Sequence, residues 1–148
     1  MCTYVNQSAT DARLKQLKNK SIGYAWKAIT IYKKTGQYCA PFYEIPYNQH
    51  NVIAHKERAT SRATSRLTSG VFHLSLTRKN ARLLAKWLQN SFYNTSNKHS
   101  YKVVKVSFKP EHLVVVGRSS YGDKREFGLA DGPDSLCVAA FDFVDKIK

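Results

Sequence analysis

The segment from residue 71 to residue 93 constrains the fold of this chain more than any other. Its first six residues, Val-Phe-His-Leu-Ser-Leu, favour a strand, and Thr77 after them is a good N-terminal cap for a helix. The apolar positions that follow recur at helical spacing: Ala81, Leu83, Leu84, Trp87, Leu88 and Phe92. The segment therefore predicts a strand and then a helix over residues 78–93 that packs one apolar face against a sheet.

Most of the remaining chain favours strands. Residues 22–43 hold two runs of aromatic and β-branched residues around the turn sequence Lys-Lys-Thr-Gly-Gln at 33–37, which predicts a β-hairpin. Further strands are expected at 101–108, at 112–117, near 124–130 and at 135–144, with a weak helix over 8–20 that is capped by Ser8 or Thr10. The predicted fold class is α+β, a mostly antiparallel sheet with one principal helix (78–93) packed on it.

The length of the chain and one long polar segment set the expected domain organisation. A chain of 148 residues can bury one core, so we expect a single domain over residues 1–148. Residues 44–70 have no apolar periodicity, and a loop of that length is usually functional or mobile. With no apolar run of about eighteen residues and no secretory signal pattern, we expect no membrane span and a cytoplasmic location.

The charge of the chain is strongly asymmetric. The formal net charge is +14, and residues 1–110 hold 19 Lys and Arg against three acids, whereas residues 111–148 hold five against seven. Such an excess attracts a polyanion and carries no information about the fold. The partner classes it predicts are nucleic acid or a nucleoprotein complex, or an acidic protein; a generally basic solubility surface is the alternative.

Part of this charge lies in a repeat, RATSRATSRLTS, at residues 58–69. In a helix Arg58, Arg62 and Arg66 would share one face at a spacing of about 6 Å, a comb of guanidinium groups suited to a row of phosphates. Serine and threonine oppose an isolated helix, so we expect the repeat to order only on a partner. The alternative is a solvated loop enlarged by a local duplication.

Two further groups of cations join the repeat in the predicted polyanion-binding surface. The first lies on the polar face of the expected helix: Arg78, Arg82 and Lys86 at i, i+4 and i+8, with Lys79 beside them. The second lies on the hairpin and consists of the lysines Lys27, Lys33 and Lys34 together with Trp26, whose ring can stack a base. A solvated helix face and ordinary hairpin packing are the alternatives.

Catalytic and metal-binding signals are weak. His73-Leu-Ser matches one half of the paired His-x-Ser/Thr strands of 2H phosphoesterases, but no other histidine supplies the second half. The odd set of cysteines, Cys2, Cys39 and Cys137, fits neither a disulfide framework nor a zinc pattern, and no phosphate-binding glycine motif occurs. We expect no cofactor and no metal, and an enzyme acting on a nucleotide or on nucleic acid around His73 is the least favoured alternative.

Three short motifs carry a resemblance. They are Gly-Tyr-Ala-Trp-Lys at 23–27, Ser-Gly-Val-Phe-His-Leu at 69–74, and the run from Val103 to Gly117. Together they resemble small uncharacterised accessory proteins encoded by bacteriophages. The resemblance implies a non-essential protein that interferes with a host or competing nucleic-acid-handling machine, and it assigns no catalytic residue.

The function expected from the sequence is non-enzymatic binding of nucleic acid or of a nucleoprotein complex through these arginine and lysine groups. The alternative from another class is a phage-type inhibitor that docks on an acidic or nucleic-acid-binding groove of a host defence protein. Both use the same positive field, so the sequence does not separate them.

Overall fold

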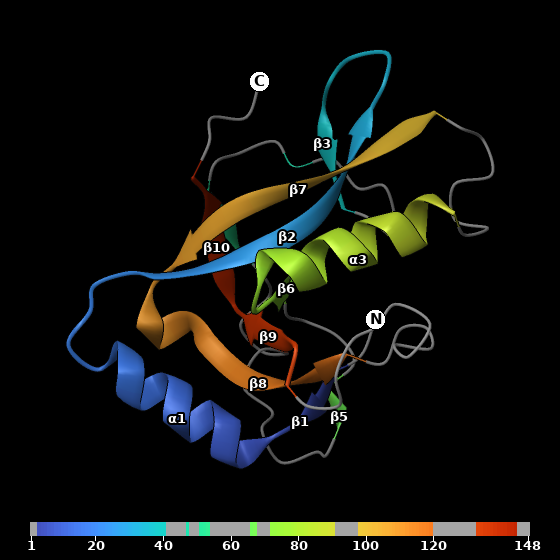
Figure 1. Ribbon diagram of the computed structural model, residues 1–148. Coiled ribbons are helices and arrows are strands. Elements are labelled where there is room, and N and C mark those ends of the chain that lie inside the picture. Colours follow the sequence, from blue (N-terminus) through green and yellow to red (C-terminus); the bar gives the residue numbers. More distant parts are fainter. Residues whose placement is uncertain are drawn as a thin grey trace.

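The computed structural model describes residues 3–40, 47, 51–53, 66–67, 72–90, 98–119 and 133–144. Within them the strands are β1 (Thr3–Val5), β2 (Gly23–Tyr32), β3 (Tyr38–Cys39), β4 (Asn51–Ile53), β5 (Arg66–Leu67), β6 (Phe72–Ser75), β7 (His99–Phe108), β8 (Leu113–Ser119), β9 (Ser135–Val138) and β10 (Ala140–Phe143). The helices are α1 (Gln7–Leu17), α3 (Arg78–Gln89) and the 3₁₀ turn η2 (Pro110–His112). Figure 1 shows their arrangement.

One antiparallel sheet joins these strands, which confirms the predicted α+β class. Its order is β4-β10-β7-β2-β6-β9-β8-β1-β5, and β3 pairs with β2 to form the expected hairpin. The longest ladder joins β2 to β7, from Gly23 opposite Phe108 to Tyr32 opposite His99. The prediction of one principal helix is confirmed in part, since α3 is present and a second α-helix, α1, at the position of the weak helix expected over residues 8–20, packs beside β8.

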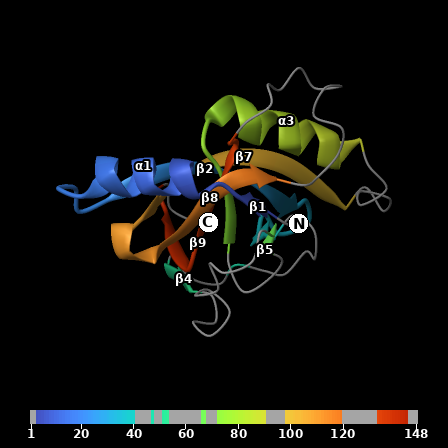
Figure 2. The same cartoon turned by 90° about the horizontal axis from the view of Figure 1, so that it is seen from below.

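Helix α3 covers one face of the β2–β7 ladder (Figure 1, Figure 2). Its cap is the predicted one, since the Thr77 hydroxyl accepts a hydrogen bond from the Asn80 amide at 3.1 Å. Its buried stripe packs against Ala28 and is made of Leu84, Ala85 and Leu88. The helix ends at Gln89 and not at residue 93, to which the sequence pattern extends it.

The main core lies on the other face of the same ladder. Ala25 and Ile29 point there because side chains alternate along a strand, and they belong to the same buried cluster as Leu17 at the end of α1. Asn6 caps α1, not Ser8 or Thr10 as predicted, and its side chain accepts from the Ala9 amide at 2.9 Å. Thr10 instead fixes α1 to β8, since its buried hydroxyl accepts from the Val116 amide at 2.9 Å. Both faces of β2 are therefore covered along part of its length.

Two other segments differ from the prediction. Residues 135–144 form two strands instead of one, since β9 pairs with β8 and β6 while β10 pairs with β7 and β4. Within 44–70, residues 51–53 and 66–67 are strands that pair with β10 and β1, and most of the remaining segment lies outside the described residues, as does the strand expected near 124–130. Among the described helices, none is long and apolar enough to cross a membrane.

Candidate nucleic-acid interface

The first half of β2 presents two aromatic rings on the face that α3 leaves partly uncovered. Tyr24 and Trp26 are two residues apart, so both point to the same side of the sheet. The Arg78 guanidinium at the start of α3 lies 5.4 Å from the centre of the Trp26 ring. The Lys105 ammonium, from the position of β7 opposite Trp26, lies 4.5 Å from the centre of the Tyr24 ring.

Arg13 of α1 completes this group from the other side. One of its terminal nitrogens donates to the backbone oxygen of Tyr24 at 3.1 Å, and the other donates to Gln16 at 3.3 Å. Its buried Nε has no acceptor among the described residues. We call Arg13, Tyr24, Trp26, Arg78 and Lys105 the cation–aromatic surface.

Stability does not explain this arrangement well. Tyr24 keeps 48% of its surface exposed, so its ring adds little buried apolar area. A cation over an exposed ring contributes only about 0.5–1 kcal/mol. Three cations are gathered around one exposed ring, Tyr24, and one partly buried ring, Trp26, which is typical of a binding surface.

The outer face of α3 extends the positive charge. Arg78, Lys79, Arg82 and Lys86 are all exposed, and none pairs with a carboxylate within the described part of the chain. Arg78 and Lys79 stand in the first turn, which contains no acidic residue. Cations there oppose the helix dipole, whose N-terminal end is positive, so this turn concentrates positive potential beside Trp26. The face runs for about 12 Å from Arg78 to Lys86.

Two adjoining hollows lie beside the C-terminal half of α1. The smaller, of about 430 Å³, is lined by residues that include Arg13, Lys20, Ile22 and Tyr24, so it opens next to the cation–aromatic surface. The larger, of about 830 Å³, shares Lys20 with it and reaches Lys109.

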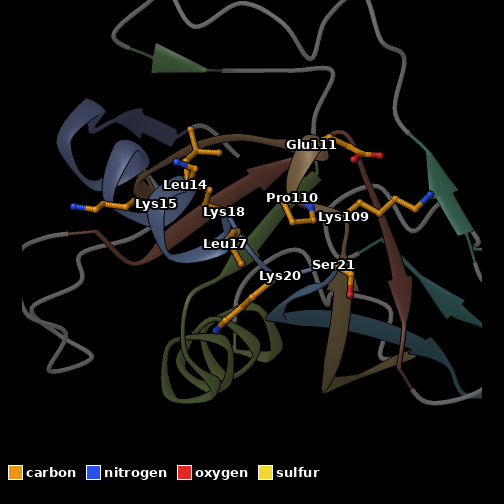
Figure 3. A pocket seen from close by; sticks show the side chains of 9 residues that line it. All are labelled: Leu14, Lys15, Leu17, Lys18, Lys20, Ser21, Lys109, Pro110 and Glu111. Carbon is orange, nitrogen blue, oxygen red and sulfur yellow. The ribbon is translucent and has the colours of Figure 1, made fainter.

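Figure 3 shows the larger hollow from close by, with one acid, Glu111, at its rim. The ammonium groups of Lys15, Lys20 and Lys109 point away from one another. They therefore do not converge on a single anion, and they spread a positive field over an extended region.

The structure brings some of the predicted residues together and separates others. Trp26 and Arg78 are in contact, and Lys79, Arg82 and Lys86 continue from them along α3. Lys33 and Lys34 are exposed at the far end of β2, roughly 25 Å along the strand from Trp26. The hairpin lysines thus lie apart from the rings that they were expected to flank.

The arginine repeat does not form a helix through Arg66. Arg66 lies in strand β5, where it pairs with Tyr4 of β1. It is therefore not the third member of a helical comb with Arg58 and Arg62. Arg58 and Arg62 lie outside the described residues.

Lys27 is the clearest correction to the predicted surface. It is only 6% exposed and points into the main core, because its neighbour Trp26 occupies the other face of β2. Its ammonium donates to the His73 backbone oxygen at 3.1 Å and lies 5.6 Å from the centre of the Phe141 ring. Burial lowers the pKa of Lys27 to about 8, and the charge of Cys137 opposes that shift. Lys27 is not placed to contact a partner at the surface.

His73 belongs to the same interior group. Its Nδ1 lies 3.3 Å from the sulfur of Cys137 on the neighbouring strand β9. Burial first, and then the positive charge of Lys27, lower the pKa of His73 to about 3. The imidazole is therefore neutral at pH 7, and neither hollow described above is lined by it. Within the described residues no cluster of three His, Cys, Asp or Glu side chains gathers as a metal site would need.

Sequence reasoning missed three members of the surface. Tyr24 had a signal, since its alternation with Trp26 places both rings on one side of a strand. Lys105 and Arg13 had none, because only the β2–β7 register and the docking of α1 bring them to Tyr24.

In comparisons with known proteins, no family, no curated protein and no solved structure matches this chain.

Proposed function

We propose that this protein is a non-enzymatic accessory protein that binds nucleic acid, free or in a nucleoprotein complex. The binding site is the cation–aromatic surface together with the outer face of α3. The observation that carries the proposal is the pairing of two neighbouring rings with two cations, the exposed Tyr24 with Lys105 and the partly buried Trp26 with Arg78. Such pairs supply a cation for a phosphate and a stacking platform for a base within one patch.

The charge around the patch supports the same partner. Arg82 and Lys86 lie one and two turns along α3 from Arg78, and Lys20 stands beside Tyr24 in the smaller hollow. The diverging lysines of Figure 3 suit an extended polyanion better than a small anion, since they do not meet at one point. Affinity of this kind is independent of the nucleotide sequence and falls steeply as the salt concentration rises.

Salt titration of single-charge variants tests the proposal. We expect Arg78→Gln, Arg82→Gln and Lys105→Gln each to weaken binding of a labelled oligonucleotide and to reduce the slope of log affinity against log salt. The slope should fall by about 0.7–0.9 for each phosphate that the variant no longer neutralises. Lys34→Gln is the matched control, because it removes the same charge at the far end of β2. Equal slopes for all four variants and the wild type would contradict the proposal.

The second candidate is a phage-type inhibitor that docks on an acidic or nucleic-acid-binding groove of a host defence protein. The observation that favours it is the same set of exposed cations on α3, which would also complement carboxylates. This candidate predicts small, uneven effects of the glutamine variants on oligonucleotide binding. A large loss of affinity would instead appear against one protein partner, concentrated in a few residues.

A further inference from the structure

We infer that the nucleic acid bound at the cation–aromatic surface is single-stranded, with unstacked bases lying on Tyr24 and Trp26. The inference rests on the proposed function and adds the class of partner. It depends on the spacing of the two rings, on the exposure of Tyr24, and on the shape of the surface beside them.

The spacing of the rings matches separated bases. Two residues along a strand span about 6.7 Å, which is roughly twice the rise of about 3.4 Å between neighbouring stacked bases. Bases that are still stacked on each other cannot each cover one of these rings. A strand whose bases have been spread apart can place one base on Tyr24 and another near Trp26.

The exposure of Tyr24 also favours a single strand. A duplex presents phosphates and the edges of its bases, so an exposed ring gains nothing from it by stacking. A single strand presents the faces of its bases, and each stacked base contributes to affinity whatever its sequence. Nearly half of the surface of Tyr24 is open to such a base.

The surroundings of Tyr24 provide a path for the rest of a nucleotide. The smaller hollow combines the apolar side chain of Ile22, which is 44% exposed, with the cations Arg13 and Lys20. A base can contact the apolar part while a phosphate meets a cation. Lys105 stands opposite Trp26 and reaches Tyr24 diagonally, so its ammonium can neutralise a phosphate between the two bases.

Affinity measurements with matched oligonucleotides test the inference. The probes are a single-stranded DNA of thymine nucleotides, a single-stranded RNA of uracil nucleotides of equal length, and a DNA duplex with the same number of phosphates. We expect both single strands to bind more tightly than the duplex. Tyr24→Leu should lower affinity for the single strands about 5- to 100-fold and leave duplex affinity unchanged, and Tyr24→Phe should restore it.

The chain offers a matched control at Tyr4. This residue is 43% exposed and has the Arg118 guanidinium 5.8 Å from the centre of its ring, but β1 lies four strands from β2 in the sheet. Tyr4→Leu should leave all three affinities unchanged. In a Trp87→Phe background, where Trp26 is the remaining tryptophan, single strands should quench the fluorescence and the duplex should not.

The outcomes separate the inference from the proposed function. Duplex binding as tight as single-strand binding, or an equal effect of Tyr24→Leu on both, would overturn the inference and leave the proposed function standing. Absence of binding to all three probes at low salt would overturn both. A difference between the thymine and uracil probes would assign the single strand to DNA or RNA.

Discussion

Replacing the buried Lys27 with methionine should stabilise the protein in a pH-dependent way. Lys27 is 6% exposed, and its ammonium has one hydrogen-bond acceptor within the described residues, the His73 backbone oxygen. Burial lowers its pKa from 10.5 to about 8. Methionine has a similar length and no charge, so Lys27→Met removes the cost of burying the ammonium and keeps the side-chain volume.

The size of the effect follows from the two pKa values of Lys27. Between pH 8 and 10.5 the unfolded chain holds a proton on this side chain that the folded chain has released, so wild-type stability rises with pH. At about 1.4 kcal/mol per pH unit, the interval corresponds to about 3 kcal/mol. The free energy of unfolding of Lys27→Met should therefore exceed that of the wild type, and the difference should be largest at and below pH 8. That advantage should shrink by about 3 kcal/mol as the pH reaches 10.5.

Urea denaturation at a series of pH values, followed by tryptophan fluorescence, measures this difference. Removal of the hydrogen bond to His73 shifts the whole difference curve by a constant amount and leaves its pH dependence in place. Lys34→Met is the control, because Lys34 is exposed in the hairpin turn and should give a flat curve. A flat difference curve for Lys27→Met as well would refute the assignment of Lys27 to the interior.

Two other variants probe the positions of buried groups. Because the pKa of His73 is lowered from 6.5 to about 3, wild-type stability should fall by about 1.4 kcal/mol per pH unit as the pH drops through that interval. His73→Gln should flatten this loss in acid unfolding experiments, and an unchanged slope would argue against burial of the His73 ring. Gly23→Ala should lower the free energy of unfolding by about 1–3 kcal/mol, since an added Cβ would lie 2.5 Å from the buried Phe108 ring. If chemical denaturation gives the variant the same free energy of unfolding as the wild type, the Phe108 ring does not pack tightly on Gly23.

Local patterns in the sequence predicted the elements whose cause is local. The Thr77 cap, the apolar stripe of α3 and the turn between β2 and β3 each depend on residues a few positions apart, and each is present in the structure. The cap of α1 was predicted wrongly because Asn6, Ser8 and Thr10 are all good caps, and only the contact of Thr10 with β8 decides between them.

The composition of the binding surface needed long-range information. Lys27 was assigned to the surface because the hairpin was read as a stretch of mixed rings and lysines. Its alternation with Trp26 places the two side chains on opposite faces, but both faces of β2 are partly covered, by α3 and by the main core, so the sequence does not show which face is open. Lys105 reaches Tyr24 only through a pairing between strands some 80 residues apart.

Photo-cross-linking is the most direct test of the proposed interface. The protein is irradiated with a bound single-stranded oligonucleotide, digested with trypsin, and analysed by mass spectrometry for nucleotide adducts. Cleavage after Lys20 and Lys27 releases residues 21–27 as one peptide that holds both Tyr24 and Trp26. We expect the adducts to concentrate in this peptide and to diminish in the Tyr24→Leu variant. Adducts confined to other peptides, such as the one that holds Tyr4, would contradict the proposed interface.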